Sequence, residues 1–133
     1  MSHPEYRRKL PDEKTWEGPR VAGSAEFDSL DVDSRIKILT ILEAMDWPQL
    51  ICFSYDGSDR VVAPFIVGIS SEGNPLLRGY QTEGISRSGK GPGWRVFQIK
   101  KIVNLENYQD FFYPDDFHFE GEYPWIHKVF KML

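Results

Sequence analysis

The chain contains a single cysteine, Cys52, among its 133 residues. One cysteine excludes a disulfide framework within the chain, so the cysteine content gives no sign of secretion. Long apolar runs are also missing, because none approaches the roughly 18 residues that suggest a transmembrane helix. The N-terminus lacks the apolar core of a signal peptide. We therefore expect one cytoplasmic domain that does not enter a membrane.

Catalytic patterns are scarce as well. The sequence shows no Ser-His-Asp order and no paired-carboxylate arrangement. Cys52 with His118 or His127 as its base is a conceivable nucleophile, but a lone cysteine within an apolar run is typical of an inert buried thiol. We therefore expect no enzyme.

The C-terminal region concentrates residue types that bind metal ions. Their spacing matches no compact cation site, and the preceding Tyr113-Pro114 indicates an exposed acidic loop. We expect neither a metal nor another cofactor at these residues, which are Asp115, Asp116, His118, Glu120 and Glu122.

The net charge of −4 conceals an uneven distribution. Residues 73–103 hold six basic residues against one acid, whereas residues 21–72 hold nine acids against three bases. Residues 104–133 are again acidic. The overall acidity argues against a general nucleic-acid binder, while the basic block is compatible with one site for an anionic ligand.

Residues 49–108 form five short apolar runs separated by turn signals such as Asp56-Gly57 and Gly73-Asn74. Runs of this kind predict antiparallel hairpins, and five of them predict a mainly β domain with a small, strongly bent sheet or barrel. Pro64 favours an edge strand or a bulge, and Gly68 and Gly79 favour sharp bends. Lys100-Lys101 joins the last two runs and fits a single helical turn.

The clearest helix covers residues 33–46. Asp33 or Ser34 can cap its N-terminus, and Asp46-Trp47-Pro48 ends it, because a residue before proline avoids the helical region. A helix-turn-helix reader needs two such helices in tandem, so we expect no DNA-binding head. The predicted buried face is a stripe at helical period, with Ile36, Leu39, Leu42 and Met45 widened by Ile38, Ile41 and Ala44.

The two ends of the chain give weaker patterns. Residues 1–30 are interrupted by proline and glycine and predict an arm that either packs through Trp16 and Phe27 or is partly disordered. Residues 31–133 then form a single domain, with residues 109–133 as a C-terminal extension. Pro124 can open a short helix there. Its apolar face would pack on the barrel or on a second copy, through Trp125, Ile126, Val129, Phe130 and Leu133.

The segment 84–90 has the glycine and lysine spacing of a phosphate-binding P-loop. Gly91 stands where a hydroxyl for magnesium is needed, and a strand pattern follows where a helix is needed. A flexible basic loop is the better interpretation, and it can still bind an anion through Arg87, Lys90 and its backbone N–H groups.

Basic and aromatic residues alternate through the strands and this loop. Arginines with interleaved aromatics on a sheet can hold phosphates and stack bases, although Trp94 and Phe97 can equally belong to the core. We expect Arg78 and Arg95 to contribute to ligand affinity and little to folding. The candidate ligand-binding residues are Arg60, Arg78, Tyr80, Arg87, Lys90, Trp94 and Arg95.

In order and spacing, residues 49–108 resemble the WYL domain, a bacterial ligand-sensing module of transcriptional regulation. The likeness lies in Ile51-x-Phe53-x-Tyr55, Arg60-x-Val62-x-Pro64, Leu76-Leu77-Arg78-Gly79-Tyr80 and Arg95-x-Phe97-x-Ile99. Where the family shows Trp-Tyr-Leu, this chain has Pro75-Leu76-Leu77. The resemblance implies a five-stranded barrel similar to Sm and SH3 folds, and basic pocket positions at Arg60, Arg78 and Arg95.

The sequence therefore predicts a non-catalytic regulatory module that senses an anionic ligand, either a nucleotide or a single-stranded nucleic acid. The alternative is a protein-interaction or structural module that uses its acidic, aromatic C-terminal region to bind a protein partner or a second copy.

Overall fold

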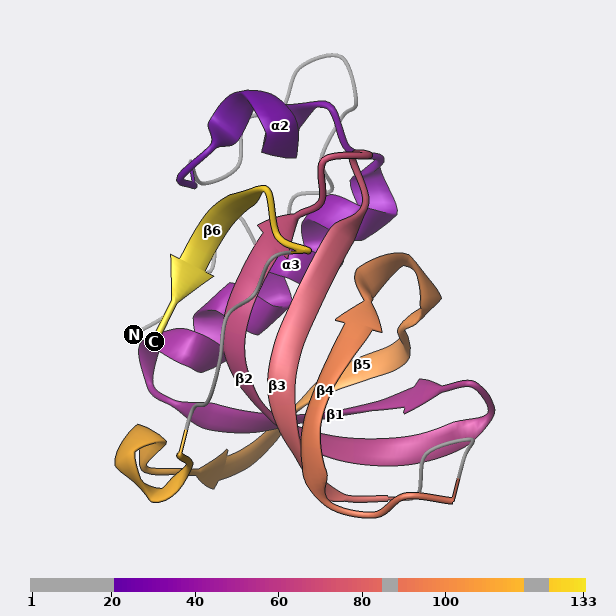
Figure 1. Ribbon diagram of the computed structural model, residues 1–133, viewed down its shortest axis with the longest axis vertical. Coiled ribbons are helices and arrows are strands. Elements are labelled where there is room, and N and C mark those ends of the chain that lie inside the picture. The colour runs from indigo at the N-terminus through magenta and orange to yellow at the C-terminus, as the bar shows by residue number, and fades with distance from the viewer. Residues whose placement is uncertain (1–20, 85–88, 119–124) are drawn as a thin grey trace.

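The computed structural model describes residues 21–84, 89–118 and 125–133 (Figure 1). In chain order, the elements are the helices α2 (Ser24–Asp28) and α3 (Val32–Asp46), the strands β1 (Gln49–Tyr55), β2 (Ser58–Ile69), β3 (Pro75–Glu83) and β4 (Gly93–Gln98), the 3-10 turn η1 (Ile99–Lys101), β5 (Val103–Phe111), the 3-10 turn η2 (Pro114–Asp116) and β6 (Lys128–Met132).

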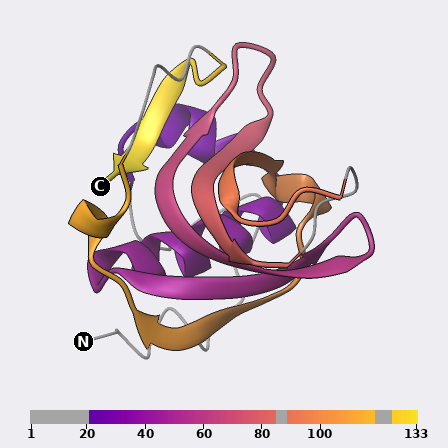
Figure 2. The same ribbon diagram turned by 60° about the horizontal axis from the view of Figure 1, so that its bottom comes forward.

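The strands form one antiparallel sheet in the order β4-β3-β2-β1-β5, with β6 paired to β2. The mainly β fold is confirmed, the five predicted runs correspond to β1–β5, and the predicted turn at Lys100-Lys101 is η1. Figure 2 shows how strongly β2 and β3 bend. Among the described residues no ladder joins β4 to β5, so the sheet is not closed.

Strand β2 changes partner part-way along its length. Its first half pairs with β1 as far as Val62, opposite Ile51, and its second half pairs with β6 from Ile66, opposite Met132. Pro64 lies between these two sections, where the register with β3 shifts. The predicted bulge is confirmed. The edge-strand alternative is wrong, because β2 is central and the change of partner is what accommodates a residue without an N–H.

Two strand glycines allow neighbouring strands to approach closely. A Cβ atom at Gly68 would lie 2.4 Å from both Ile126 Cγ2 and Lys128 O. A Cβ atom at Gly79 would lie 2.6 Å from Val62 Cγ1. Distances this short exclude a side chain, so glycine is required at both positions for packing against β6 and β2 respectively.

Helix α3 confirms the predicted helix, but its cap is not the predicted one, and only part of the predicted face is fully buried. The carboxylate of Asp31 accepts hydrogen bonds from Ser34 N at 3.1 Å and Ser34 Oγ at 2.7 Å. The cap thus precedes both predicted positions, which lie inside the first turn. Ile38, Ile41, Ala44 and Met45 of the predicted face are fully buried. Leu39 and Leu42 are only partly buried, and Ile36 is 39% exposed, so the buried face is centred on the residues that were expected to widen the stripe.

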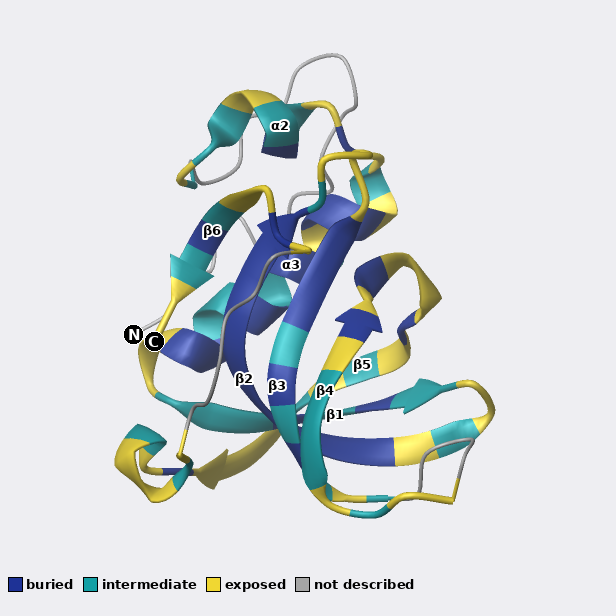
Figure 3. Ribbon diagram, in the orientation of Figure 1, coloured by how far each residue is buried: buried dark blue, intermediate teal, exposed yellow. Residues whose placement is uncertain are grey.

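Apolar clusters lie on both sides of the sheet, and Figure 3 shows β2 and β3 buried along most of their length. The larger cluster joins α2 and α3 to the sheet and includes Phe27, Ile38, Ile51, Val62, Leu77, Phe97 and Ile102. The smaller cluster lies on the opposite side and includes Phe65, Ile66, Leu76, Phe112 and Ile126, with Tyr80, Trp94 and Phe117 packed against it.

The predicted C-terminal helix is wrong, because residues 128–132 form the strand β6. The second half of β2 offers a free edge, and pairing with it satisfies more backbone groups than one isolated helical turn would. The predicted packing is confirmed for Phe130, which is 5% exposed and makes an edge-to-face contact with Phe27 of α2. Phe27 is thus docked as predicted, while Trp16 and Pro124 lie outside the described residues.

Candidate functional site

Of the seven candidate ligand-binding residues, Arg60 is used inside the protein. Its side chain is 3% exposed, and its guanidinium donates to Ser58 Oγ at 2.9 Å, Gln81 Oε1 at 3.1 Å and Tyr55 O at 3.1 Å. The same group lies over the ring of Tyr55, 5.5 Å from its centroid. These contacts link β2 to β1 and β3, so the N–H donors of Arg60 are used within the protein and do not face a ligand.

Lys90 lies in the loop that precedes β4, and Arg95 is a residue of β4 whose side chain contacts that loop. The guanidinium of Arg95 donates to Trp94 O at 2.9 Å and to Gly91 O, so it fixes the end of this loop. Arg95 is half-buried, and Lys90 is exposed. Arg87, the remaining basic residue of the loop, lies outside the described residues.

Arg78, by contrast, lies between two tryptophans. Its guanidinium carbon is 5.4 Å from the ring centroid of Trp94 and 5.3 Å from that of Trp125. Arg78 and Tyr80 are two residues apart on β3 and share a face, and Trp94 of β4 stands opposite Tyr80 in the ladder. Trp125 comes from the segment that leads into β6, so three separate parts of the chain converge on one cation.

Other aromatic rings hold Trp94 in place beside Arg78. Trp94 makes edge-to-face contacts with Phe65 at 4.9 Å and with Tyr80 at 5.5 Å between ring centroids. Its Nε1 donates to His118 O at 3.1 Å. Phe117 in turn packs on Tyr80, with 4.9 Å between ring centroids. The ring that borders Arg78 is therefore fixed in position by contacts on several sides.

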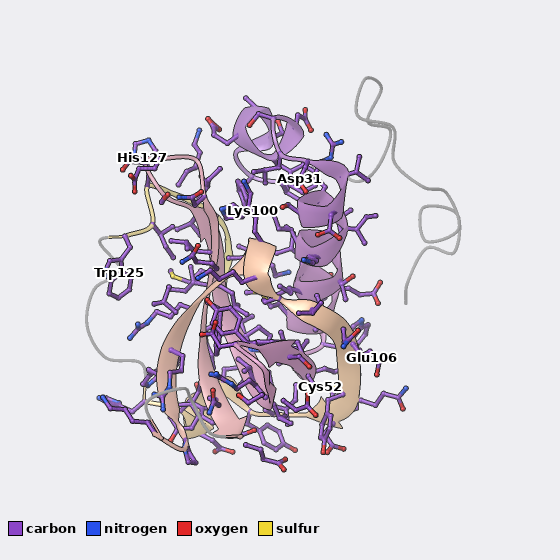
Figure 4. The ribbon with its side chains drawn as sticks, turned by 90° about the vertical axis from the view of Figure 1, so that its right-hand side faces the viewer. Asp31, Cys52, Lys100, Glu106, Trp125 and His127 are labelled. Carbon is purple, nitrogen blue, oxygen red and sulfur yellow. The ribbon has the colours of Figure 1, made fainter. Side chains whose placement is uncertain are left out.

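The site combines a positive charge with accessible aromatic surface. Burial lowers the pKa of the Arg78 guanidinium from its usual value, yet an arginine remains protonated at neutral pH. Trp125 is 46% exposed, and in Figure 4 it projects from the side of the molecule opposite to α3. Arg78, Trp94 and Trp125, with Tyr80 beneath them, are the arginine–tryptophan site.

The remaining chemical candidates are less well placed. Burial raises the pKa of the Cys52 thiol, and the nearby Glu106 and Asp59 raise it further, so the thiol stays protonated at neutral pH. Within residues 21–84, 89–118 and 125–133, no three His, Cys, Asp or Glu side chains form a group that could hold a metal ion. Glu120 and Glu122 of the acidic cluster lie outside those ranges. The helices in this part of the chain are also too short or too polar to cross a bilayer.

Three of the four residues of the arginine–tryptophan site were predicted from the sequence as ligand-binding residues, and Trp125 was not. Arg78, Tyr80 and Trp94 were expected from the basic and aromatic pattern, and they do lie together. Trp125 was expected only as part of an apolar helix face, because its partner Arg78 is distant in sequence. Comparison of the chain with protein-family models, with curated proteins and with solved structures found no match in any of the three.

Proposed function

We propose that this protein is a non-catalytic binding module that takes an anionic ligand with a planar ring, a nucleotide or a single-stranded nucleic acid, at the arginine–tryptophan site. The observation that supports it is the position of the Arg78 guanidinium between the Trp94 and Trp125 rings. An arginine fork recognises phosphate through paired hydrogen bonds, and an exposed indole offers a stacking surface to any base.

The strand arrangement supports a relationship to small barrels as part of the same proposal. The order β4-β3-β2-β1-β5 and the single 3-10 turn between β4 and β5 agree with an SH3- or Sm-like barrel that is not fully closed. A WYL-like ligand-sensing role fits this arrangement. The family's basic positions would then divide in this chain, with Arg78 facing the ligand and Arg60 serving the fold.

A titration with fluorescein-labelled oligothymidine and labelled adenine nucleotides, at low and high salt, tests this function. The matched variants are Arg78→Met, which keeps the apolar stem, and Lys101→Ala, which removes an exposed positive charge from η1. Because a charge-assisted bond is worth about 1.5–3 kcal/mol, Arg78→Met should weaken binding by roughly tenfold to a hundredfold. Lys101→Ala should change it little.

Trp125→Ala separates stacking from charge. It should weaken oligothymidine binding while leaving the salt dependence unchanged, because the number of phosphate contacts stays the same. Failure of every probe to bind at low salt would overturn the proposal. Equal affinity of the wild type and Arg78→Met, with both folded by thermal melting, would move the site elsewhere.

A further inference from the structure

The edge of the sheet formed by β5 and η2 exposes large aromatic side chains. Phe111 is 67% exposed, Tyr113 is 75% exposed and Tyr108 is 39% exposed. Trp47, between α3 and β1, is 58% exposed and lies near the end of β5, because Phe112 N donates to the adjacent Pro48 O at 2.9 Å. Figure 3 shows exposed residues along β5, in contrast with β2.

The charge along this edge has one sign. Residues 103–118 contain four carboxylates and neither lysine nor arginine. On neighbouring elements, Lys131 is paired with Asp46 and Lys37 is paired with Asp33. Lys100 and Lys101 of η1 are exposed, but they precede the first residue of β5, at the far end of the strand from Phe111 and Tyr113. We call the three aromatics and the four carboxylates the β5–η2 surface: Tyr108, Phe111, Tyr113, Glu106, Asp110, Asp115 and Asp116.

The backbone of β5 is poorly suited to adding another strand. Asn104 and Gln109 have positive φ values of 54° and 68°, and the register with β1 shifts next to both residues. Bulges of this kind interrupt an edge ladder and are a common protection against edge-to-edge pairing. A second copy joined through β5, or a long partner strand, is therefore disfavoured, and recognition would depend on side chains.

We propose that the β5–η2 surface binds an arginine-bearing, positively charged segment of a partner protein. A guanidinium can stack on an exposed ring of Phe111 or Tyr113, and the other basic groups of the segment can pair with carboxylates of the same surface. Lysine offers only a compact, strongly hydrated ammonium, so arginine is the preferred cation. The rings supply contact area, and the carboxylates determine the charge of the partner.

The β5 part of this surface lies away from the arginine–tryptophan site, whereas η2 leads into Phe117 and His118, which contact Tyr80 and Trp94 of that site. Figure 4 places Trp125 and Glu106 at opposite sides of the molecule, with the sheet between them. The two sites also have opposite charges. A partner segment bound along β5 therefore leaves the arginine–tryptophan site open to an anionic ligand, and the inference does not depend on the proposed ligand.

Fluorescence anisotropy with three labelled octapeptides tests the inference on the full chain. The peptides alternate serine with arginine, lysine or glutamate. The arginine peptide should bind most tightly, the lysine peptide more weakly and the glutamate peptide not at all. Phe111→Ala and Tyr113→Ala should each weaken arginine-peptide binding by about twofold to fivefold, the range of exposed cation–π contacts. Tyr113→Phe should retain it.

Two further variants define the outcome. Asp110→Asn combined with Asp115→Asn should reduce both the affinity and its salt dependence, whereas Val103→Ala, at an exposed position on the same strand, should change neither. Equal binding of the arginine and glutamate peptides, or no binding of either, would overturn the inference. Phe111-dependent self-association in sedimentation would identify a second copy as the occupant instead, and binding that is lost with Arg78→Met would place the peptide at the other site.

Discussion

Arg60 shows how one residue can have the chemistry of a ligand-binding group and yet serve the fold. Its three hydrogen bonds are to a hydroxyl, an amide oxygen and a backbone carbonyl of its own chain, and its cation lies against Tyr55. A buried cation without such contacts would be strongly destabilising. Arg60 therefore needs these acceptors to compensate for the burial of its charge, and the buried acceptors need Arg60 as a hydrogen-bond donor.

Replacing Arg60 by methionine should destabilise the protein rather than the complex with its ligand. The substitution keeps most of the volume but leaves the oxygens of Gln81, Tyr55 and Ser58 without their donor, at a cost of about 2–4 kcal/mol. Urea unfolding measures the loss. Arg95→Met, a half-exposed position, is the control and should lose less. If Arg60→Met left the stability unchanged and weakened oligothymidine binding, Arg60 would be a ligand-binding residue after all.

At this scale the sequence could indicate which residue types matter but not which way they face. Arg60, Arg78 and Arg95 all lie on β-strands among apolar residues, and the strand period alone cannot show which of them faces solvent. Their side-chain contacts differ in the folded protein. The Arg60 guanidinium bonds to Gln81 of the neighbouring strand, and the Arg95 guanidinium bonds to the loop before its own strand. The Arg78 guanidinium instead lies against two tryptophan rings. Each outcome depends on contacts with residues far away in the sequence.

Among the elements, helix α3 has a titratable cap. Burial acts to raise the pKa of Asp31, but the hydrogen bonds from Ser34 outweigh it, and the pKa is lowered from its usual 3.8. A group whose pKa is lower in the folded state contributes stability above its unfolded pKa, and this contribution is lost as the pH falls through the folded value.

Asp31→Ala should therefore lower the free energy of unfolding at pH 7 by about 0.5–2 kcal/mol, the usual value of a side-chain cap. The difference between variant and wild type should shrink as the pH falls below 3.8, because the wild-type carboxylate becomes protonated there. Chemical unfolding at pH 7 and pH 3 measures both effects. A difference that does not vary with pH would mean that the charged carboxylate is not what caps the helix.

The strands of the sheet were easier to predict than the C-terminal element. Residues 49–98 alternate hairpin signals with apolar runs, so the strands β1 to β4 pair with their neighbours in sequence, whereas β5 pairs with the distant β1. Residues 128–132 carry an apolar pattern that fits a short helix or a strand equally well, and periodicity cannot distinguish the two. The strand forms because the second half of β2, beyond Pro64, is not paired with β1 and offers an edge to residues 128–132.

In the molecule as a whole, the two ends of the described chain stabilise each other. Phe130 of β6 contacts Phe27 of α2, and Lys128 pairs with Glu26 at 3.1 Å. Arg35 of α3 donates to Asp28 O at 3.0 Å, so α2 is also tied to the longer helix. Phe27 and Phe130 are buried, so their contact contributes most to this stabilisation. The Lys128–Glu26 ion pair lies at the surface and contributes little.

Phe130→Ala should consequently loosen both ends at once. Phenylalanine-to-alanine substitutions in a core typically cost about 3–5 kcal/mol. Hydrogen exchange should show faster opening of the amides of β6 and of α2 together, with β1 to β3 opening more slowly than either. Met132→Ala, at a half-exposed position on the same strand, is the control. Loss of protection in β6 alone would show that α2 is held independently.

The two-part pairing of β2 also determines the order in which the chain can fold. The β1–β2, β2–β3 and β3–β4 ladders join neighbours, whereas the remaining two must bring Asn107 to Ile51 and Met132 to Ile66. Bringing distant segments together costs loop-closure entropy before any contact compensates for it. We therefore expect the four-strand meander to form first, and β5 and β6 to pair afterwards with β1 and with the second half of β2.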